Sequence, residues 1–205
     1  MKLLLWSWNV NGLRAVLNKG FIEIIQREQP DILGIQETKL QEHQIPKELN
    51  TLNEYLIYWS HSSRKGYSGT GLFTKLLPLN FSTGFGNPEF DCEGRINIAE
   101  YFKFIYLNIY FPNGQKDDER LSYKLRFYDR CLEIMEEKRS LGKIILVGGD
   151  FNTAHHPCLL YTSDAADDLL CVDLGGRRLI KKKQLLKTHL QSLLLYTPHL
   201  TLTAI

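Results

Sequence analysis

Carboxylate, amide and phenol side chains follow four apolar stretches of the 205-residue sequence, each close to the point where the stretch ends. Side chains of these types suit two tasks, which are binding a hard cation such as Mg²⁺ and contacting a phosphate. In α/β proteins, ligand sites gather at the carboxyl ends of strands. The four clusters are Asn9 with Asn11, Gln36 with Glu37, Tyr110 with Asn113, and Asp150 with Asn152.

Glu37 and Asp150 are the acidic members of these clusters and the candidate metal ligands. Mg²⁺ commonly takes one or two protein carboxylates and keeps several waters, so two acids are enough. The four cysteines form no C-x-x-C pair, which argues against a zinc site. A single acid at a strand end is more often a helix cap or a solvated turn residue, but the repetition at four strand ends favours a site.

Apolar runs bounded by Gly, Pro and Asn predict the elements that position these clusters. We expect strands over 3–8, 31–35, 55–60 and 143–147, a hairpin formed by 95–101 and 104–110, and helices over 14–28 and 119–139. Strands that alternate with helices, with hairpins between them, indicate an α/β fold. The predicted architecture is a sandwich of two mixed β-sheets flanked by helices.

Residues 1–156 contain four motifs that carry a family resemblance. They are Trp8-Asn9-Val10-Asn11-Gly12-Leu13-Arg14-Ala15, Gln36-Glu37-Thr38-Lys39, Tyr110-Phe111-Pro112-Asn113-Gly114 and Gly149-Asp150-Phe151-Asn152. In this order they resemble the exodeoxyribonuclease III family of apurinic/apyrimidinic endonucleases, which is part of the wider endonuclease/exonuclease/phosphatase superfamily. The Asn-Gly-Leu-Arg and Gln-Glu-Thr-Lys strings favour its DNA-repair branch over its lipid and inositol phosphatases.

The resemblance implies a reaction, a cofactor and a partner. The reaction is hydrolysis of the DNA phosphodiester 5′ to an abasic site, or 3′→5′ removal of nucleotides. The cofactor is Mg²⁺, with Mn²⁺ as an alternative ion, and the partner is double-stranded DNA with abasic sites or 3′ ends. The implied roles are metal binding for Glu37 and Asn9, contact with the scissile phosphate or the DNA backbone for Tyr110, Asn113 and Arg95, activation of the attacking water for Asp150, and phosphate binding for Asn152. Arg95 would alternatively support the structure of the site.

The composition changes after His156. All ten Phe and all three Trp precede it, whereas Leu supplies 14 of the last 49 residues. We therefore interpret 1–156 as the N-terminal portion of the family domain and 157–205 as a non-family tail, artefactual in origin and poorly ordered. A variable C-terminal segment, with a Leu/Lys helix over 180–195, is the alternative. In the first interpretation the predicted fold is incomplete, because the C-terminal part of the family fold is missing.

The family's terminal Ser-Asp-His motif has no match here, since the sequence contains no Asp-His pair. We expect the chain as written to be truncated and inactive. Two other hypotheses stay open, namely a related phosphoesterase acting on another substrate and a non-catalytic nucleic-acid-binding remnant. A natural tail would favour the second of these.

The overall charge does not argue for nucleic-acid binding. The chain has 25 basic and 23 acidic residues, and residues 1–156 carry 19 of each sign, so DNA affinity must come from a local patch or a bound metal. No apolar run approaches the roughly 20 residues that span a bilayer. We expect a cytoplasmic monomer without membrane contact.

Overall fold

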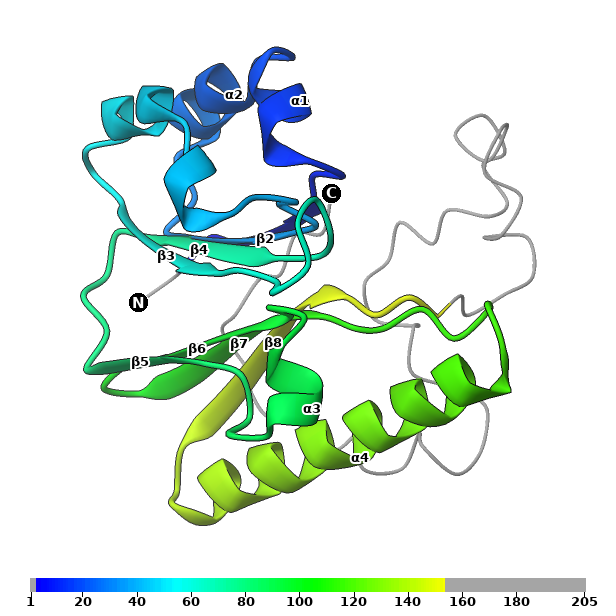
Figure 1. Cartoon of the computed structure of the whole chain (residues 1–205). Coiled ribbons are helices and arrows are strands. Elements are labelled where there is room, and N and C mark those ends of the chain that lie inside the picture. The colour runs from blue at the N-terminus through cyan, green and yellow to red at the C-terminus, as the bar shows by residue number, and fades with distance from the viewer. Residues whose placement is uncertain (1–2, 154–205) are drawn as a thin grey trace, which may run out of the picture. The chain divides into compact units, whose positions relative to one another are not determined.

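The structure is a computed structural model that describes residues 3–153 of the chain. Strands in this range form two four-stranded sheets that face each other (Figure 1). The first sheet has the order β1-β2-β4-β3 and contains β1 (Leu5–Asn9), β2 (Ile32–Gln36), β3 (Leu56–Ser60) and β4 (Thr70–Thr74). The second has the order β5-β6-β7-β8 and contains β5 (Asn80–Thr83), β6 (Ile96–Glu100), β7 (Phe104–Tyr110) and β8 (Ile144–Asp150).

Both sheets are mixed, as the sequence predicts. In the first sheet β1 runs parallel to β2, and β4 is antiparallel to both β2 and β3. In the second sheet β5, β6 and β7 are antiparallel in turn, and β8 is parallel to β7. Asn9 lies opposite Gln36 and Tyr110 lies opposite Asp150, so each parallel pair ends at the same level. The register thus brings the predicted polar clusters to matching strand ends.

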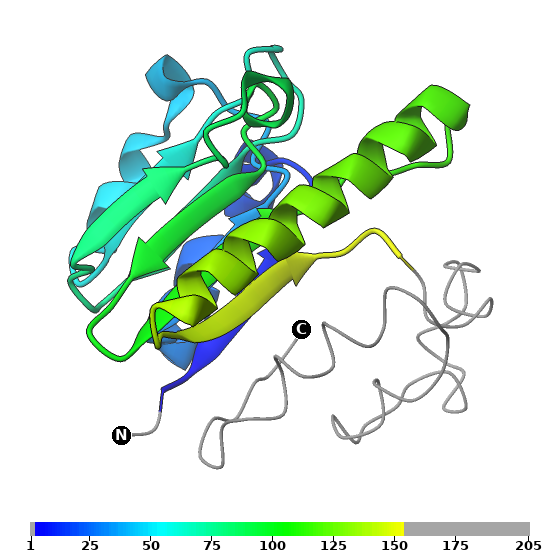
Figure 2. The same cartoon turned by 90° about the horizontal axis from the view of Figure 1, so that it is seen from below.

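Helices cover the outer face of each sheet, which gives four layers (Figures 1 and 2). Figure 2 shows α4 (Asp118–Ser140), the longest helix within residues 3–153, running along the second sheet. The first sheet is covered by α1 (Leu13–Leu17), α2 (Phe21–Glu28) and the 3₁₀ helices η1 (Glu42–Gln44) and η2 (Lys47–Thr51), and the second by α3 (Pro88–Asp91) and α4 (Asp118–Ser140). The expected sandwich flanked by helices is confirmed.

Apolar side chains fill the spaces between these layers. The interior between the two sheets includes Leu5, Ile32, Leu72, Tyr106 and Leu146. The space between the first sheet and its helices includes Trp6, Leu13, Phe21, Ile25, Leu33 and Phe73. Beneath α4, Phe127 packs against the rings of Phe85, Phe90 and Phe111. Because burial of each large apolar side chain contributes about 1.5–3 kcal/mol, these contacts hold the layers in place.

A buried polar network joins the two sheets. The Asn108 side chain of β7 donates to the carbonyls of Ile35 (3.1 Å) and Gly71 (3.0 Å) and to Asn97 Oδ1 (3.0 Å). Its own Oδ1 accepts a 2.6 Å hydrogen bond from Gln36 Nε2. Buried polar groups need such partners, and these partners sit on both sheets. The network therefore fixes how β2 and β7 face each other.

Several elements differ from the sequence prediction. The helix expected over 14–28 is two helices, because Gly20 adopts a left-handed backbone (φ 88°) between them. The last strand continues to Asp150, beyond the predicted end at residue 147. The elements expected from the sequence did not include β4, β5, α3, η1 or η2. The predicted tail over 157–205, with its helix over 180–195, lies outside the described residues.

Candidate active site

Four side chains from four strand ends meet at one edge of the sandwich. Asn9 is the last residue of β1 and Glu37 directly follows β2, so both belong to the first sheet. Tyr110 ends β7 and Asp150 ends β8, in the second sheet. Each came from a different polar cluster of the sequence. The two parallel strand pairs therefore bring all four clusters to one place.

Hydrogen bonds join the four side chains directly. Asn9 Nδ2 donates to Glu37 Oε1 at 2.9 Å and to Asp150 Oδ2 at 2.7 Å. The Tyr110 hydroxyl donates to the same Glu37 Oε1 at 2.8 Å. Two carboxylates thus share one amide nitrogen, although Asn9 and Asp150 are 141 residues apart in sequence. The arrangement places two acids and a phenol around one small volume.

The position of Asp150 depends on a close approach between β7 and β8. Gly149 has φ 148°, and a Cβ there would lie only 1.9 Å from the carbonyl oxygen of Ile109. Only glycine fits between the strands at this point. The amide of Phe111 then donates to the Asp150 carbonyl at 2.9 Å, which extends the β7–β8 contact past the strand end. The Asp150 side chain is therefore carried on a rigid, paired strand.

Glu37 is held in the ionised form. Burial of the carboxyl raises its pKa, but hydrogen bonds from Asn9, Tyr110 and Lys39 and the charge of Lys39 outweigh this, so the pKa lies below its ordinary value of 4.5. The Lys39 ammonium lies 3.1 Å from Glu37 Oε2. The backbones of Glu37 and Lys39 are both left-handed, with φ of 56° and 54°. Such strained non-glycine residues cluster at functional sites.

Arg95 supports Tyr110 from behind. Its side chain is only 2% exposed. Its guanidinium donates to the Tyr110 carbonyl at 3.0 Å and lies 4.5 Å from the centre of the Tyr110 ring. A cation over an aromatic face is attracted to it and fixes the ring's orientation. The burial of Arg95 favours the supporting role over the direct DNA contact that the sequence also allowed.

Arg95 is in turn held by a charged cluster on the second sheet and α4. Glu93 pairs with Arg95 at 2.5 Å and with Arg120 of α4 at 2.8 Å. Both arginines donate to the Tyr67 hydroxyl at 3.0 Å. Burial raises the pKa of Glu93, but the two arginines more than reverse this, so the pKa lies below 4.5. A network of partly buried charges that are paired with one another is rigid, and this one holds Arg95 against Tyr110.

The surroundings of the remaining residues of the four polar clusters differ from one to the next. Asn113 is exposed, and its side chain accepts a 3.0 Å hydrogen bond from the Gln115 amide, which makes a local turn. Asn152 has a left-handed backbone (φ 48°) and is half-buried. Gln36 points into the sandwich and is 1% exposed, so it belongs to the network between the sheets. The proposed contacts of Asn113 and Asn152 with phosphate stay predictions.

The residues present fit a divalent cation that keeps part of its water shell. Among residues 3–153 there is no group of three or more His, Cys, Asp or Glu side chains placed to hold a metal. Glu37 and Asp150 nevertheless supply two carboxylates joined through one amide. Mg²⁺ commonly binds through one or two carboxylates plus waters, whereas Zn²⁺ prefers Cys and His. The donor set therefore matches the predicted Mg²⁺ or Mn²⁺ in chemical type.

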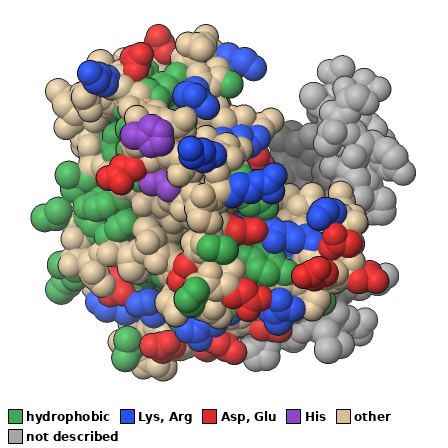
Figure 3. Space-filling view, viewed as in Figure 1, with side chains coloured by type: hydrophobic (Ala, Val, Ile, Leu, Met, Phe, Trp, Pro, Cys, Tyr) green, Lys and Arg blue, Asp and Glu red, His purple; other side chains and the backbone are tan. Residues whose placement is uncertain are grey.

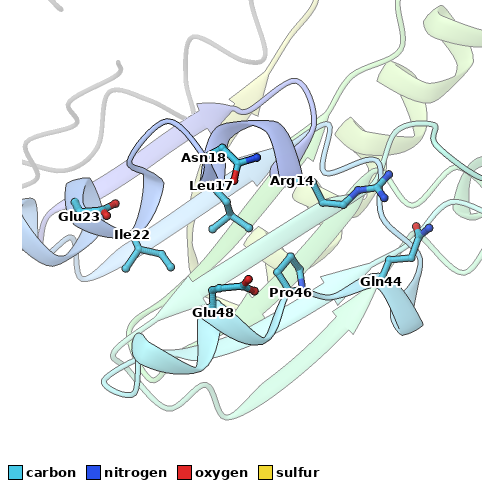
Figure 4. A pocket seen from close by; sticks show the side chains of 8 residues that line it. All are labelled: Arg14, Leu17, Asn18, Ile22, Glu23, Gln44, Pro46 and Glu48. Carbon is cyan, nitrogen blue, oxygen red and sulfur yellow. The ribbon is translucent and has the colours of Figure 1, made fainter.

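The surface has a groove beside the first sheet's helices and a mixed distribution of charge over α4. A groove of about 520 Å³ lies between the α1–α2 region and the η1–η2 segment, with Arg14, Glu23 and Glu48 along its walls (Figure 4). Its lining does not include the four joined side chains. Basic and acidic side chains are interspersed over α4 (Figure 3), in keeping with the balanced charge of 1–156. No helix in residues 3–153 has the length and apolar character to cross a membrane.

Three residues of this region had no role assigned from the sequence. Lys39 stood in a recognised motif, but nothing in the sequence placed its ammonium on Glu37. Tyr67 and Arg120 lie 28 and 25 residues from Arg95 in sequence and meet it, or its partner Glu93, only in the fold. The sequence offered one signal for the charged cluster, which is the Glu-x-Arg spacing of Glu93 and Arg95. This spacing places two opposite charges together directly before β6.

Comparison with known proteins places these features in a family. Residues 6–163 match the model of the endonuclease/exonuclease/phosphatase family. The chain is 38% identical over 156 residues to an exodeoxyribonuclease of Bacillus subtilis, covering 76% of the chain and 60% of that protein. It is also 38% identical over 150 residues to a DNA-(apurinic or apyrimidinic site) endonuclease of Dictyostelium discoideum, covering 73% of the chain and 41% of that protein.

A solved structure gives the same picture of the fold. An AP endonuclease from Archaeoglobus fulgidus superposes with a TM-score of 0.67 at 27% identity, over 76% of this chain and 60% of that one. The chain thus spans 60% or less of the length of each of these relatives. The sequence expectation of an exodeoxyribonuclease III-like fold is confirmed, for the portion of the relatives that the chain covers.

Proposed function

This chain belongs to the endonuclease/exonuclease/phosphatase family, and we propose that its site serves Mg²⁺-dependent hydrolysis of DNA phosphodiesters in base-excision repair. The proposed reactions are incision 5′ to an abasic site and 3′→5′ removal of nucleotides. Support for the substrate comes from the relatives, one named an exodeoxyribonuclease and one an apurinic or apyrimidinic site endonuclease. The substrate is then double-stranded DNA with abasic sites or 3′ ends.

One observation carries the proposal. Asn9 donates hydrogen bonds to both Glu37 and Asp150, and Tyr110 donates to Glu37 as well. Phosphodiester hydrolysis needs a group that accepts a proton from water, and donors or cations that stabilise charge on the phosphate oxygens. Two ionisable carboxylates and a phenol within one cluster provide these types of group. A purely structural cluster would not need two acids at these partly buried strand ends.

Each side chain has a proposed task. A bound divalent cation would supply Lewis-acid stabilisation of the phosphoryl oxygens. Glu37 would hold that cation, and Asn9 would orient both carboxylates through its shared amide. The Tyr110 hydroxyl would donate a hydrogen bond to a phosphate oxygen, and Asp150 would accept a proton from the attacking water. Arg95 would keep the Tyr110 ring in position.

The test is an incision assay on a duplex with one synthetic abasic site, with Mg²⁺ present or chelated. We expect chelation to abolish cleavage, and Asp150→Asn to lower kcat/KM by about 10²–10⁴-fold, the usual contribution of a positioned general base. Glu133→Gln, at an exposed acid on α4, is the matched control and should leave the rate unchanged. In a protein whose unsubstituted form cleaves the duplex, equal rates for Asp150→Asn and the control would refute the assigned role.

The absolute rate of this chain is a separate prediction. Because the sequence has no match to the terminal Ser-Asp-His motif of the family, we expect the 205-residue chain alone to be slow or inactive. The assay is therefore run in parallel on the product of the gene sequenced past the codon for His156. Activity confined to RNA or to small phosphate esters would instead favour the alternative phosphoesterase. The cytoplasmic location and monomeric state stay predictions.

A further inference from the structure

Glu37 uses its two carboxylate oxygens differently. Oε1 accepts hydrogen bonds from two neutral donors, the Asn9 amide and the Tyr110 hydroxyl. Oε2 instead faces the Lys39 ammonium at 3.1 Å. One side of the carboxylate is thus fixed by the site's neutral groups, and the other side is occupied by a positive charge that belongs to the protein.

The Lys39 ammonium is held in this position rather than resting there by chance. It also donates a hydrogen bond to Asn11 Oδ1. Asn11 is itself tied to the cluster, since its backbone amide donates to Asn9 Oδ1 at 3.0 Å. The Lys39 amide donates to the Ser68 carbonyl at 2.8 Å, which fixes a backbone that is left-handed. A loose surface lysine would have neither the strained backbone nor the second side-chain partner.

We propose that Lys39 is a resident counter-ion of the site, which pairs with Glu37 Oε2 in the absence of metal and weakens the binding of a divalent cation. This inference rests on the proposed function, because it assumes that Glu37 is a metal ligand. A divalent cation and an ammonium compete for the same carboxylate, and they repel each other across a short distance. Lys39 therefore sets the metal affinity of the site.

The geometry separates this role from a structural one. Only about a third of the Lys39 side chain and a fifth of the Glu37 side chain are exposed, at 35% and 19%, so solvent screens their interaction incompletely. Removal of the charge leaves Glu37 Oε1 anchored by Asn9 and Tyr110. Glu37 would thus keep its orientation while its second oxygen becomes available to a cation.

The experiment is calorimetric titration of Mg²⁺ into the full 205-residue chain in the absence of DNA, with Mn²⁺ as a second probe. Lys39→Met removes the charge and keeps an unbranched apolar side chain that is one atom shorter. We expect about tenfold tighter binding, because the ammonium no longer repels the cation at this partly exposed site. Lys39→Arg keeps the charge and should bind like wild type. Lys103→Met is the matched control, at an exposed lysine in the β6–β7 turn, away from the strand end that carries Tyr110.

Each outcome gives a decision. Tighter binding in Lys39→Met alone supports the proposal. Unchanged affinity in Lys39→Met overturns it and assigns the ammonium to another partner, such as a DNA phosphate. Weaker binding also overturns it, because Lys39 would then be needed to shape the metal site. Absence of Mg²⁺ and Mn²⁺ binding in every variant, with circular dichroism showing a folded chain, refutes the metal dependence of the proposed function as well.

Discussion

The buried network between the sheets permits a stability prediction for Asn108→Leu. Asn108 donates to the Ile35 and Gly71 carbonyls and to Asn97, and accepts from Gln36, and Asn97 and Asn108 are both 0% exposed. Leucine has a similar branched shape but makes none of these bonds. The Asn97 amide is the group most affected, because its Nδ2 already has no partner among the described residues.

The magnitude follows from the groups that lose a partner. A buried amide that has lost its hydrogen-bond partner, here that of Asn97, costs about 1–3 kcal/mol. The carbonyls of Ile35 and Gly71 each lose one hydrogen bond, which costs about 1 kcal/mol each. We therefore expect Asn108→Leu to lower the free energy of unfolding by about 3–5 kcal/mol. That is a large fraction of the roughly 5–15 kcal/mol that stabilises a typical domain. Gln36 is affected less, because its Nε2 also donates to Ser7 and to the Gly34 carbonyl.

The assay is urea denaturation followed by tryptophan fluorescence and by circular dichroism. All three tryptophans, Trp6, Trp8 and Trp59, lie on strands of the first sheet, so fluorescence reports on one side of the network. Asn50→Leu, at an exposed position in η2, is the matched control and should change stability by less than about 0.5 kcal/mol.

A second variant tests the reasoning itself. If the cost comes from the stranded Asn97 amide, then Asn97→Leu combined with Asn108→Leu should be more stable than Asn108→Leu alone, because both partners are then apolar. A loss below about 1 kcal/mol in the single variant would refute the argument. So would a double variant that is less stable than the single one.

Three other predictions follow from the same contacts. Gly149→Ala should lower the thermal midpoint or prevent folding, because its Cβ would overlap the Ile109 carbonyl, and calorimetry checks this. Gly142→Ala is the control for the overlap, because Gly142 also has a positive φ (77°) but its added Cβ would meet nothing within 4 Å; it should destabilise the protein less than Gly149→Ala. Glu93→Gln should flatten the dependence of stability on pH. The pKa of folded Glu93 lies below 4.5, so its ionised form stabilises the fold above that pH and loses this contribution as the pH falls; equal wild-type and variant slopes in acid would contradict it. Tyr110→Phe should lower kcat for metal-dependent cleavage by about 10-fold or more, because the hydroxyl that donates to Glu37 is lost. Its circular dichroism spectrum should be unchanged, and an unchanged kcat would contradict the prediction.

The core of the site could be predicted from residue types and the strand pattern. Each of the four clusters follows an apolar run, and parallel strands bring their carboxyl ends to one edge. The sequence did not separate Gln36 from Glu37, however. Side chains alternate between the faces of a strand, so one of the two had to point inward, but only the packing against Asn108 shows which.

The position of Lys39 could not be predicted from the sequence. Its ammonium reaches Glu37 because both residues have positive φ, which residues other than glycine rarely adopt. The Tyr67–Arg120 contacts depend on how α4 lies over the second sheet, and no local pattern encodes that. Interactions between elements that are distant in sequence were thus the part of the site that the residue pattern missed.

The fold was predictable where the patterns were long. The hairpin of β6 and β7 and the helix α4 each extend over many residues, and both are present. The β5 strand is short and largely exposed, so its four residues carry no apolar alternation. Residues 14–28 have one continuous helical pattern of apolar residues, but the left-handed Gly20 splits it into two helices.

The shared Asn9 amide has a consequence for the order in which the protein is made. Its two acceptors, Glu37 and Asp150, lie 28 and 141 residues further along the chain. During synthesis from the N-terminus, Asn9 and Glu37 can meet early, whereas Asp150 arrives only when the last described strand leaves the ribosome. A nascent chain therefore carries half of the acidic pair for most of its synthesis, and cannot complete the contacts among Asn9, Glu37 and Asp150 before β8 has docked.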